Sequence, residues 1–309
     1  MEMYVMIKIS EVLEFLNENN IKHILKGNKE LCFETFCPLN NLKSHAITWV
    51  RNAEQLDVEL LNKTTGILLI AEMGAKIDNA HFSIIYAENA HRTFFRILSF
   101  FFESQNPDCR EASIASTAII ETQKIGLNLR VGHHTYIGND VEIGNNVTIL
   151  NNVTIQGHVT IGDYTVIESG TTIGACGFGQ YWDEDGNPVT VAHLGGVKIG
   201  HHVKIGANNG ISRGCLSDTI IEDYVQTDNL CHIAHNDVIK RGAILTANSV
   251  ISGSTTVGEN VWLAPGSILN NSITVGKDAF LGLGAVATKD VSENKVVVGM
   301  PAKPLRDRY

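Results

Sequence analysis

The chain has 309 residues, enough for about two domains, and it is rich in glycine (28 residues) but poor in proline (6) and in aromatic side chains (7%). A hydrophobic fraction of 44% and a charged fraction of 18% exclude an intrinsically disordered chain. The net charge of −9 argues against nonspecific binding to nucleic acid or anionic membranes, which needs clustered positive charge. This composition is typical of a regular repeat with tight corners and a core of small aliphatic side chains.

Residues 1–108 contain no repeat and predict a small α/β domain at the start of the chain. Ser10 is expected to cap a helix that runs to about Asn19. An apolar run over 94–102 predicts a second helix, which ends at Asn106–Pro107. Three further apolar runs predict strands, at residues 46–50, 66–70 and 83–86.

From residue 109 to 291 an aliphatic side chain recurs at every sixth position, giving 25 hexads in three blocks (119–173, 199–211 and 221–287). A period of six fits neither an α-helix nor simple strand alternation. It fits a solenoid in which each hexad forms one side of a triangular coil, with the aliphatic residue inside and Gly or Asn in the turn. The sequence therefore predicts a mainly β protein, a parallel β-helix of about eight coils stacked at ~4.8 Å.

Two segments interrupt the repeat, and a solenoid accommodates such insertions as surface loops. The first, residues 175–188, contains Phe178, Tyr181 and Trp182, aromatic side chains of the kind that the coils avoid. This composition predicts a ligand-binding loop. The second interruption, residues 213–219, adds four residues to a coil and is expected only to seal a corner.

His235 is the sharpest candidate for a catalytic base, because it lies two residues after the inward-facing Ile233 and therefore near a corner. Gly253 lies one coil of 18 residues further on, where its backbone can approach a group held at His235. A base beside a main-chain N–H is the minimum for acyl transfer: the base removes a proton from the attacking amine or hydroxyl, and the N–H stabilises the oxyanion. A surface histidine without a role is the alternative.

The six cysteines form no CxxC pair and have no metal-ligand spacing, so they predict reduced thiols in a cytoplasmic protein. The adjacent pairs His133–His134 and His201–His202 point in different directions and predict solvated side chains. We assign no metal ligand, although a three-histidine zinc site shared between subunits is an alternative for such a prism. The chain contains neither an apolar run long enough for a membrane span nor a signal-peptide core at its start.

Residues 170–270 closely resemble the UDP-3-O-(3-hydroxyacyl)glucosamine N-acyltransferases of lipid A synthesis. The stretches that match are 174–179 (Gly-Ala-Cys-Gly-Phe-Gly), 196–200, 213–220 and 228–236. Because that family folds as a left-handed parallel β-helix, the resemblance implies this handedness here. It also implies that His235 is the general base and Gly253 the oxyanion-hole glycine.

The resemblance implies binding positions for the acceptor as well. Residues 46–55 are similar to the family's uridine-binding motif, with Trp49 and Asn52 retained in type and Gln55 in place of a tyrosine. Stacking on one aromatic side chain suits a thymidine or a uridine diphospho-sugar. The expected substrate-binding residues are Trp49, Asn52, Gly177, Phe178, Gly179, Asp228, Asn229 and Asn236.

The C-terminal end departs from that family, since no auxiliary histidine occurs near Asn271–Ser272 and no helical extension for acyl carrier protein follows. Residues 284–303 instead resemble the ending of coenzyme-A-dependent sugar acetyltransferases, although a cap that closes the solenoid is the alternative. Residues 292–309 are expected to form a short irregular tail. The expected donor-binding residues are Gly284, Ala285, Lys289, Pro301 and Lys303.

Together these observations predict an N-acyltransferase that moves an acyl group from a pantetheine thioester, preferably acyl-CoA, to the amine of a dTDP- or UDP-linked amino sugar. We expect a homotrimer without a permanent cofactor, with a nucleotide-binding domain (1–108), a β-helix acyltransferase domain (109–291) and a tail (292–309). The alternatives are a lipid A UDP-3-O-(3-hydroxyacyl)glucosamine N-acyltransferase that uses acyl carrier protein, an O-acyltransferase of small sugars, and a metal-binding or scaffold hexapeptide protein without transferase activity.

Overall fold

The computed structural model describes residues 6–78, 80–102, 113–301 and 303–308. The chain divides into two compact units, Met1–Arg110 and Glu111–Tyr309. The expected helix end at Asn106–Pro107 lies outside the described residues. Within the described ranges, no helix combines the length and the apolar character that a membrane crossing requires.

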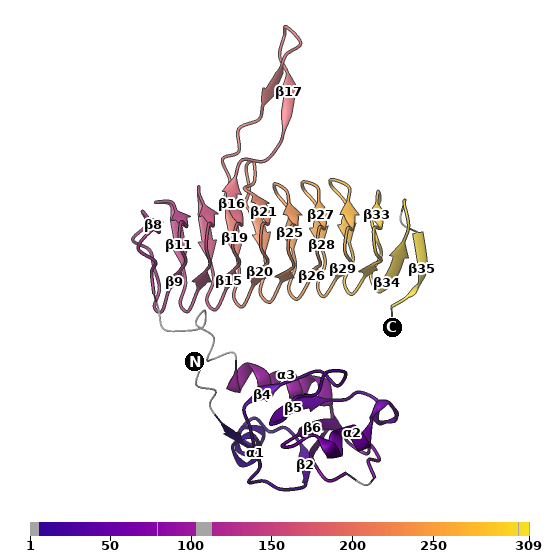
Figure 1. Cartoon of the computed structure of the whole chain (residues 1–309). Helices are drawn as coiled ribbons and strands as arrows, with labels where there is room; N and C mark the ends of the chain where they lie inside the picture. The colour runs from indigo at the N-terminus through magenta and orange to yellow at the C-terminus, as the bar shows by residue number, and fades with distance from the viewer. Residues whose placement is uncertain (1–5, 79, 103–112, 302, 309) are drawn as a thin grey trace. The chain divides into compact units, whose positions relative to one another are not determined.

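The N-terminal unit is a five-stranded sheet in the order β2-β7-β6-β5-β4, accompanied by helices (Figure 1). Its strands β5, β6 and β7 confirm the three predicted strands, and α3 confirms the second predicted helix. The elements are β1 (Ile7–Lys8), α1 (Ile9–Glu18), β2 (His23–Lys26), β3 (Cys32–Phe33), β4 (Thr35–Phe36), β5 (Ala46–Trp49), η1 (Ala53–Gln55), α2 (Val58–Lys63), β6 (Leu68–Glu72), β7 (Ser83–Ala87) and α3 (Ala90–Phe101).

The start of α1 differs from the prediction, because Ser10 lies inside the helix rather than at its cap. Lys8 occupies the cap position, and its backbone N–H donates to Glu11 Oε2 at 3.0 Å. A glutamate three residues into a helix can satisfy a free N–H of the first turn in this way. The helix therefore begins two residues earlier than a serine cap would allow.

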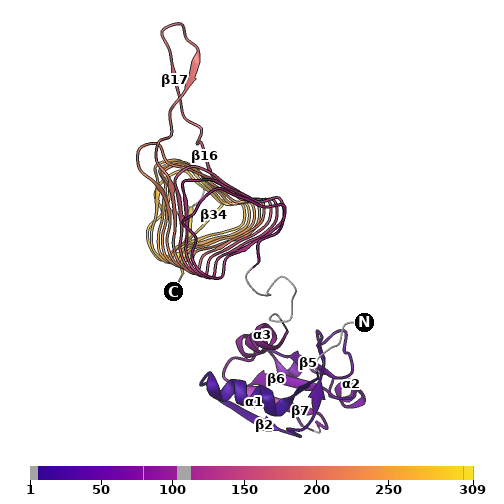
Figure 2. The ribbon, with the colours of Figure 1, turned by 90° about the vertical axis from the view of Figure 1, so that its left-hand side faces the viewer.

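The second unit is a triangular solenoid built from three parallel sheets, which Figure 2 shows nearly end-on. Sheet I consists of β8 (Ile119–Ile120), β10 (Tyr136–Ile137), β13 (Thr154–Ile155), β16 (Thr172–Ala175), β21 (Gly210–Ser212), β24 (His232–Ile233), β27 (Val250–Ile251), β30 (Ile268–Leu269) and β33 (Val286–Ala287). Sheet II consists of β11 (Val141–Ile143), β14 (Val159–Ile161), β19 (Val197–Ile199), β22 (Thr219–Ile221), β25 (Val238–Ile239), β28 (Thr256–Val257) and β31 (Thr274–Val275). Sheet III consists of β9 (Arg130–Val131), β12 (Thr148–Ile149), β15 (Val166–Ile167), β20 (Lys204–Ile205), β23 (Gln226–Thr227), β26 (Ile244–Leu245), β29 (Trp262–Leu263), β32 (Phe280–Leu281), β34 (Lys295–Val298) and β35 (Lys303–Asp307).

The predicted hexad forms the core of this solenoid. Every hexad position from Val131 to Ala287 is buried, and the side chains stack on one another along each sheet. The first two positions differ: Ile119 and Ile125 are 59% and 38% exposed, because they lie in the first coil, where no earlier coil covers them. Ile120, not Ile119, aligns with Ile137 of the next coil, so the first hexad is one residue out of register.

Asparagine and glycine both occupy the turn conformation, as at Gly170 (φ 77°) and Gly242 (φ 70°), but the glycines that directly follow an aliphatic residue have a different role. The left-handed turn conformation falls three residues after the inward aliphatic residue, for example at Asn146 (φ 55°) and Asn152 (φ 57°). Gly132, which directly follows an aliphatic residue, leaves no room for a side chain: a Cβ there would lie 2.6–2.7 Å from the backbone of Leu150 and Asn151 in the next coil. These glycines therefore permit close stacking of coils rather than the turn itself.

Two segments leave the regular coils. β17 (Gln180–Trp182) and β18 (Pro188–Thr190) form an antiparallel hairpin that projects from the solenoid (Figure 1). We expected an irregular C-terminal tail, and this expectation is wrong, because β35 pairs antiparallel with β34. This pairing satisfies main-chain groups at the open edge of the last coil, as the alternative of a simple cap predicts.

Candidate active site at one corner of the solenoid

The corner that follows sheet I brings together segments far apart in sequence, and we call it the site corner. In sheet I, β16, β21, β24 and β27 are consecutive neighbours. The residues that follow these four strands are therefore stacked: the first insertion after Ala175, the second after Ser212, His235 after β24 and Gly253 after β27. Both interruptions of the repeat thus emerge beside His235.

His235 is half-buried, and its ring is held by its neighbour in the chain. Its Nδ1 lies 3.1 Å from Asn236 Oδ1, which also accepts the Cys215 N–H at 3.0 Å. A backbone N–H can only donate, so this atom of Asn236 is the oxygen and His235 Nδ1 must carry the proton. The lone pair of the imidazole is therefore on Nε2, the nitrogen that a general base needs free.

Asn236 is itself fixed on all sides. It adopts the left-handed conformation (φ 62°), and its backbone N–H donates to Thr219 Oγ1 at 2.9 Å. Its Nδ2 donates to the carbonyl and to the hydroxyl oxygen of Ser217, at 3.0 and 2.9 Å. An orienting residue with both polar side-chain atoms satisfied holds the histidine ring in one place.

Gly253 lies directly against the imidazole. A Cβ at this position would be 2.7 Å from His235 Cε1 and 2.8 Å from Nε2. Among the residues that the structure describes, none accepts a hydrogen bond from the Gly253 N–H. The corner therefore places a free main-chain donor beside the basic nitrogen, which is the arrangement that acyl transfer requires.

The second insertion does more than seal a corner, which corrects our expectation for residues 213–219. It supplies Ser217 to Asn236, and it places Cys215 Sγ 3.8 Å from His235 Nδ1. Sequence reasoning missed both residues. The available signal was that the two insertions and His235 occupy the same register of consecutive coils.

The first insertion returns to the solenoid beside His235. Gly177 has room for no side chain, because a Cβ there would lie 2.6 Å from His193 Nε2 and 2.9 Å from His235 Cβ. His193 is 4% exposed, and its ring centre is 5.2 Å from that of His235. Gly179, also expected to bind substrate, follows at the base of the hairpin, where its carbonyl accepts the Val191 N–H at 2.8 Å.

Asp218 anchors the end of this insertion. Its Oδ1 accepts the Gly196 N–H at 2.8 Å, and its Oδ2 lies 2.8 Å from Lys198 Nζ. The ion pair with Lys198 lowers the pKa of the Asp218 carboxyl below its ordinary value, and the bond from Gly196 adds to this effect. The aromatic side chains of the hairpin remain uncovered within the chain: Phe178 is 86% exposed and Trp182 71%.

Asp237 lies inside the solenoid, directly behind the site corner. Its Oδ1 accepts the Thr255 N–H at 2.8 Å, and its side chain is fully buried. Burial raises the pKa of this carboxyl from 3.8 to about 8, because a charge is costly inside the coil and the hydrogen bonds from Thr255 and Ala234 offset only part of that cost. Asp237 is therefore protonated near neutral pH.

Asp228 and Asn229 are not brought to His235 within the chain. They follow β23 in sheet III and so lie at a different corner, where they line a hollow of about 540 Å³ with Lys204 and Glu168. Asn229 Oδ1 accepts the Ala207 N–H at 2.8 Å. Any joint action with His235 requires the corresponding corner of another copy of the chain.

In the N-terminal unit, Trp49 lies at the end of β5 and is partly buried against α3. Its ring centre is 4.8 Å from that of His91 and 6.5 Å from that of Phe95, both edge-on. Asn52 caps η1, with its Oδ1 accepting the Glu54 N–H at 3.1 Å. The two residues are close in the chain but belong to different local structures.

The five expected donor-binding residues do not form one cluster. Gly284 and Ala285 precede β33, with Ala285 buried, whereas Lys289 follows β33 at the site corner, two coils beyond Gly253. Pro301 and Lys303 belong to the terminal hairpin of sheet III. A role for them in donor binding stays a prediction.

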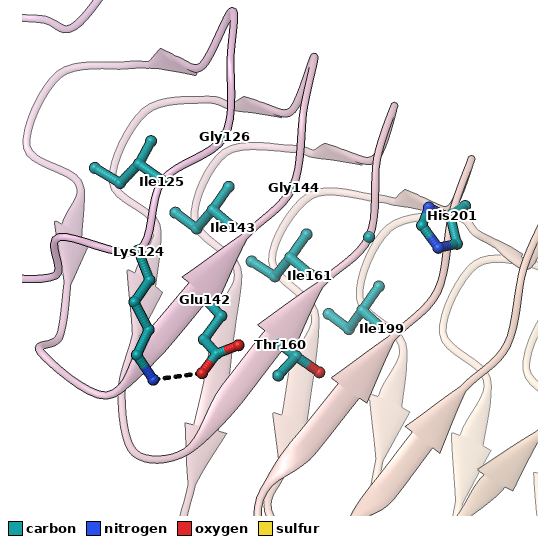
Figure 3. A pocket seen from close by; sticks show the side chains of 11 residues that line it. Lys124, Ile125, Gly126, Glu142, Ile143, Gly144, Thr160, Ile161, Ile199 and His201 are labelled. Carbon is teal, nitrogen blue, oxygen red and sulfur yellow. Dashed lines mark hydrogen bonds and ion pairs between the residues drawn. The ribbon is translucent and has the colours of Figure 1, made fainter.

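The hollow on sheet II has a different character. It encloses about 530 Å³ in the first coils, over a row of stacked isoleucines and the ion pair of Lys124 with Glu142 (Figure 3). Its histidine, His201, accepts the Asp163 N–H at Nδ1 (3.0 Å). This hollow lacks the arrangement of base and free donor found at the site corner.

The comparisons first define the class of fold. A family model described as "Bacterial transferase hexapeptide (six repeats)" matches residues 140–175. A UDP-N-acetylglucosamine acyltransferase from Bacteroides fragilis has a TM-score of 0.58 and 23% identity over 63% of this chain and 75% of its own. The corresponding values for the enzyme from Campylobacter jejuni are 0.57, 22%, 63% and 75%. The fold is the predicted left-handed parallel β-helix of hexapeptide repeats with few helices.

Sequence relatives are more specific. The chain is 50% identical over 142 residues to the UDP-3-O-acylglucosamine N-acyltransferase of Rickettsia prowazekii, covering 46% of this chain and 41% of the relative. It is 48% identical over 96 residues to UDP-3-O-acylglucosamine N-acyltransferase 2 of Legionella pneumophila, covering 31% and 28%. A probable mitochondrial counterpart in Arabidopsis thaliana is 36% identical over 142 residues, covering 46% and 47%. The chain spans less than half the length of these curated relatives.

These comparisons confirm the resemblance that the sequence indicated, and they agree with its acyltransferase class. They overturn our preferred function. The expectation of an acyl-CoA enzyme acting on a dTDP- or UDP-linked amino sugar in general is wrong, because the relatives are named for UDP-3-O-acylglucosamine. They favour the alternative that we kept beside it, and nothing in them supports coenzyme A as the donor.

Proposed function

We propose that this chain is an N-acyltransferase that acylates the amine of a UDP-3-O-acylglucosamine, using an acyl thioester carried on acyl carrier protein. One observation carries the proposal: Asn236 holds the proton on His235 Nδ1, and the basic Nε2 lies against Gly253, whose N–H has no partner among the described residues. The names of the sequence relatives support the choice of acceptor.

The reaction follows from this geometry. The glucosamine nitrogen attacks the thioester carbonyl, and His235 Nε2 accepts the proton that the nitrogen loses as the C–N bond forms. The Gly253 N–H donates to the oxygen, which carries the negative charge of the tetrahedral intermediate. When the C–S bond breaks, the thiolate takes the proton from the imidazolium. The products are an amide and a free pantetheine thiol, and His235 returns to its neutral form.

We further propose a homotrimer in which the acceptor lies between copies. Asp228 and Asn229 occupy a corner of their own, so a neighbouring copy would have to present them to His235. The exposed apolar side chains beside the site, which include Phe178, Trp182 and Leu216, suit burial against a partner. Trp49 would stack on the uracil and Asn52 would bind close to it.

The donor is the part of the proposal that differs from our first expectation. Both candidate donors, acyl carrier protein and coenzyme A, end in the same pantetheine thiol, so the chemistry at His235 is the same for either. The five described cysteines are free thiols, which suits a reducing cytoplasm, where we place the reaction.

The test is an assay with UDP-3-O-acylglucosamine and two donors that carry the same acyl chain, one on acyl carrier protein and one on coenzyme A. We expect a new amide with the carrier-protein donor and a kcat/KM at least about tenfold lower with coenzyme A. UDP-N-acetylglucosamine, whose nitrogen is already acylated, is the matched control and should give no amide. Absence of product from UDP-3-O-acylglucosamine with either donor would refute the proposed function.

A further inference from the structure

We infer that the site corner contains a binding site for a zinc ion, formed by His193, Cys215 and His235, and that zinc at this site blocks the base. One ligand atom from each residue lies within 4.8 Å of the other two. Two imidazoles and a thiolate are a donor set that zinc prefers over harder cations such as magnesium or calcium. The binding part of this inference is independent of the reaction, whereas the inhibition rests on the proposed function.

The strongest observation concerns His193. This side chain is 4% exposed, and its Nε2 has no hydrogen-bond partner among the described residues. Its Nδ1 lies 2.8 Å from the Val191 carbonyl oxygen, which can only accept, so Nδ1 carries the proton and Nε2 carries a lone pair. A buried lone pair without a partner is costly, and a histidine whose second nitrogen donates to a backbone carbonyl is the usual form of a metal ligand.

The distance between two of the three ligand atoms is close to that of a zinc complex, and all three atoms lie within 4.8 Å of one another. Cys215 Sγ lies 3.8 Å from His235 Nδ1. Zn–S and Zn–N bonds of about 2.3 and 2.05 Å place sulfur and nitrogen roughly 3.5 Å apart in a tetrahedral site. The pair therefore needs only a small adjustment, and His193 lies on the insertion, outside the regular coils. Three protein ligands leave the fourth position for water or a substrate atom.

Zinc at this site removes the base. A neutral imidazole has one lone pair, and coordination through His235 Nδ1 moves the remaining proton to Nε2, the nitrogen beside Gly253. Asn236 then also loses its bond from the ring. The ion displaces the thiol proton of Cys215, so binding releases a proton and strengthens as pH rises.

Cobalt titration of the purified full-length protein, first freed of metal with a chelator, tests the site without any assay of activity. Bound to a thiolate, cobalt gives a charge-transfer absorption in the near ultraviolet, and we expect one equivalent per chain that zinc displaces. Cys215→Ser should abolish this band, and His193→Gln should weaken binding at least about tenfold. Cys176→Ser is the control, because Cys176 lies in the first insertion, where its Sγ contacts Arg213 (2.8 Å to Nη2). No band in the wild type, or an unchanged band in Cys215→Ser, overturns the site.

A second measurement tests the inhibition. Each variant is compared with itself, with and without zinc at a concentration that saturates the wild-type cobalt site. We expect zinc to reduce acyl transfer by the wild type and by Cys176→Ser at least about tenfold, and to leave the rate of Cys215→Ser within a few-fold. Zinc that binds without slowing the wild type overturns the inhibitory role. If neither form transfers an acyl group, the proposed function fails while the cobalt result still decides the metal site.

Discussion

Two histidines at corners of the same solenoid have opposite surroundings. His202, at the corner that follows sheet II, is sandwiched between Tyr164 and Tyr224, with ring centres 4.9 Å away on each side and planes within 1° and 11° of parallel. The guanidinium of Arg241 continues this stack, 4.3 Å from the Tyr224 ring. At the site corner, His235 has Gly253 on one side and Gly177 on the other.

The comparison shows that the adjacent coils decide what a corner histidine can do. In a solenoid each side chain lies between its counterparts in the coils before and after it. Two tyrosines cover both faces of His202, so its ring serves the packing of the corner. Two glycines let the main chain approach His235 more closely than any side chain would allow, and the N–H of Gly253 has no partner among the described residues. The second insertion then adds the polar contacts that fix its proton.

The largest effect should come from replacing His235 with an amide side chain, compared with the same kind of replacement at His202. We expect His235→Gln to lower kcat by about 10²–10⁴, the usual loss when a general base is removed. His202→Asn is the control, because asparagine tolerates the left-handed conformation of that position (φ 54°), and it should leave kcat within a few-fold. Steady-state kinetics with UDP-3-O-acylglucosamine measures both. Equal losses in the two variants would show that the corners do not differ as we argue.

The residues behind the two corners differ as well, and this difference predicts a pH effect on stability. Val203 follows His202 into the core, whereas Asp237 follows Asn236. The pKa of Asp237 is raised from 3.8 to about 8, so the folded state binds this proton more tightly than the unfolded state. Stability from this group is highest below about pH 4 and is lost as the pH rises toward 8, by on the order of 6 kcal/mol at most.

Asp237→Asn, which is isosteric with the protonated acid, removes that loss. We expect the variant to melt only slightly above the wild type at pH 5, and at a much higher temperature than the wild type at pH 9. Thermal unfolding followed by circular dichroism at both pH values measures the difference. Asp185→Asn, at an exposed position in the hairpin turn, should show no such pH dependence. A variant that gains nothing at pH 9 would mean that Asp237 is ionised in the folded protein.

The next prediction concerns the space between Gly253 and the ring of His235. Gly253→Ala places a Cβ 2.7–2.8 Å from the imidazole and must displace the ring, so we expect kcat to fall about 10²-fold, as for a displacement of about 1 Å. Gly138→Ala is the matched control at an earlier coil of the same corner, where the nearest atom to a Cβ is 3.4 Å away. Comparable activity in the two variants would show that the ring has room to move.

The fold could be predicted almost completely from the sequence, because a period of six repeated over many coils has one structural solution. Within the solenoid, the errors lie where the repeat stops. Ile119 is out of register in the first coil, and the tail forms β35 because the last coil leaves an edge to be paired. Neither end is constrained by a neighbouring coil, so the hexad pattern cannot specify it.

The site was only partly predictable for the same reason. Counting 18 residues from His235 reaches Gly253, and the structure places the two in contact. The same count fails across the insertions, which change the spacing between Ser217 or His193 and the histidine. Asp228 is close to His235 in sequence but lies at another corner. Residues that are close in sequence within one coil lie on different sides of the solenoid. Residues that are distant in sequence lie together where their coils stack.

The smallest expected effect concerns the residue that orients the base. Asn236→Gly retains the left-handed backbone (φ 62°) and deletes the side chain that accepts from His235 Nδ1, so we expect kcat to fall about tenfold, as for the loss of one hydrogen bond of about 1 kcal/mol. Nitrogen NMR of labelled histidine should show the proton of His235 shared between Nδ1 and Nε2, where the wild type holds it on Nδ1. Asn248→Gly, at a corner with nearly the same φ (61°), should change neither the rate nor the tautomer. A proton that stays on Nδ1 in Asn236→Gly would contradict this role of Asn236. It would mean that the loop with Cys215, on the adjacent coil, orients the base instead of the neighbouring residue in the chain.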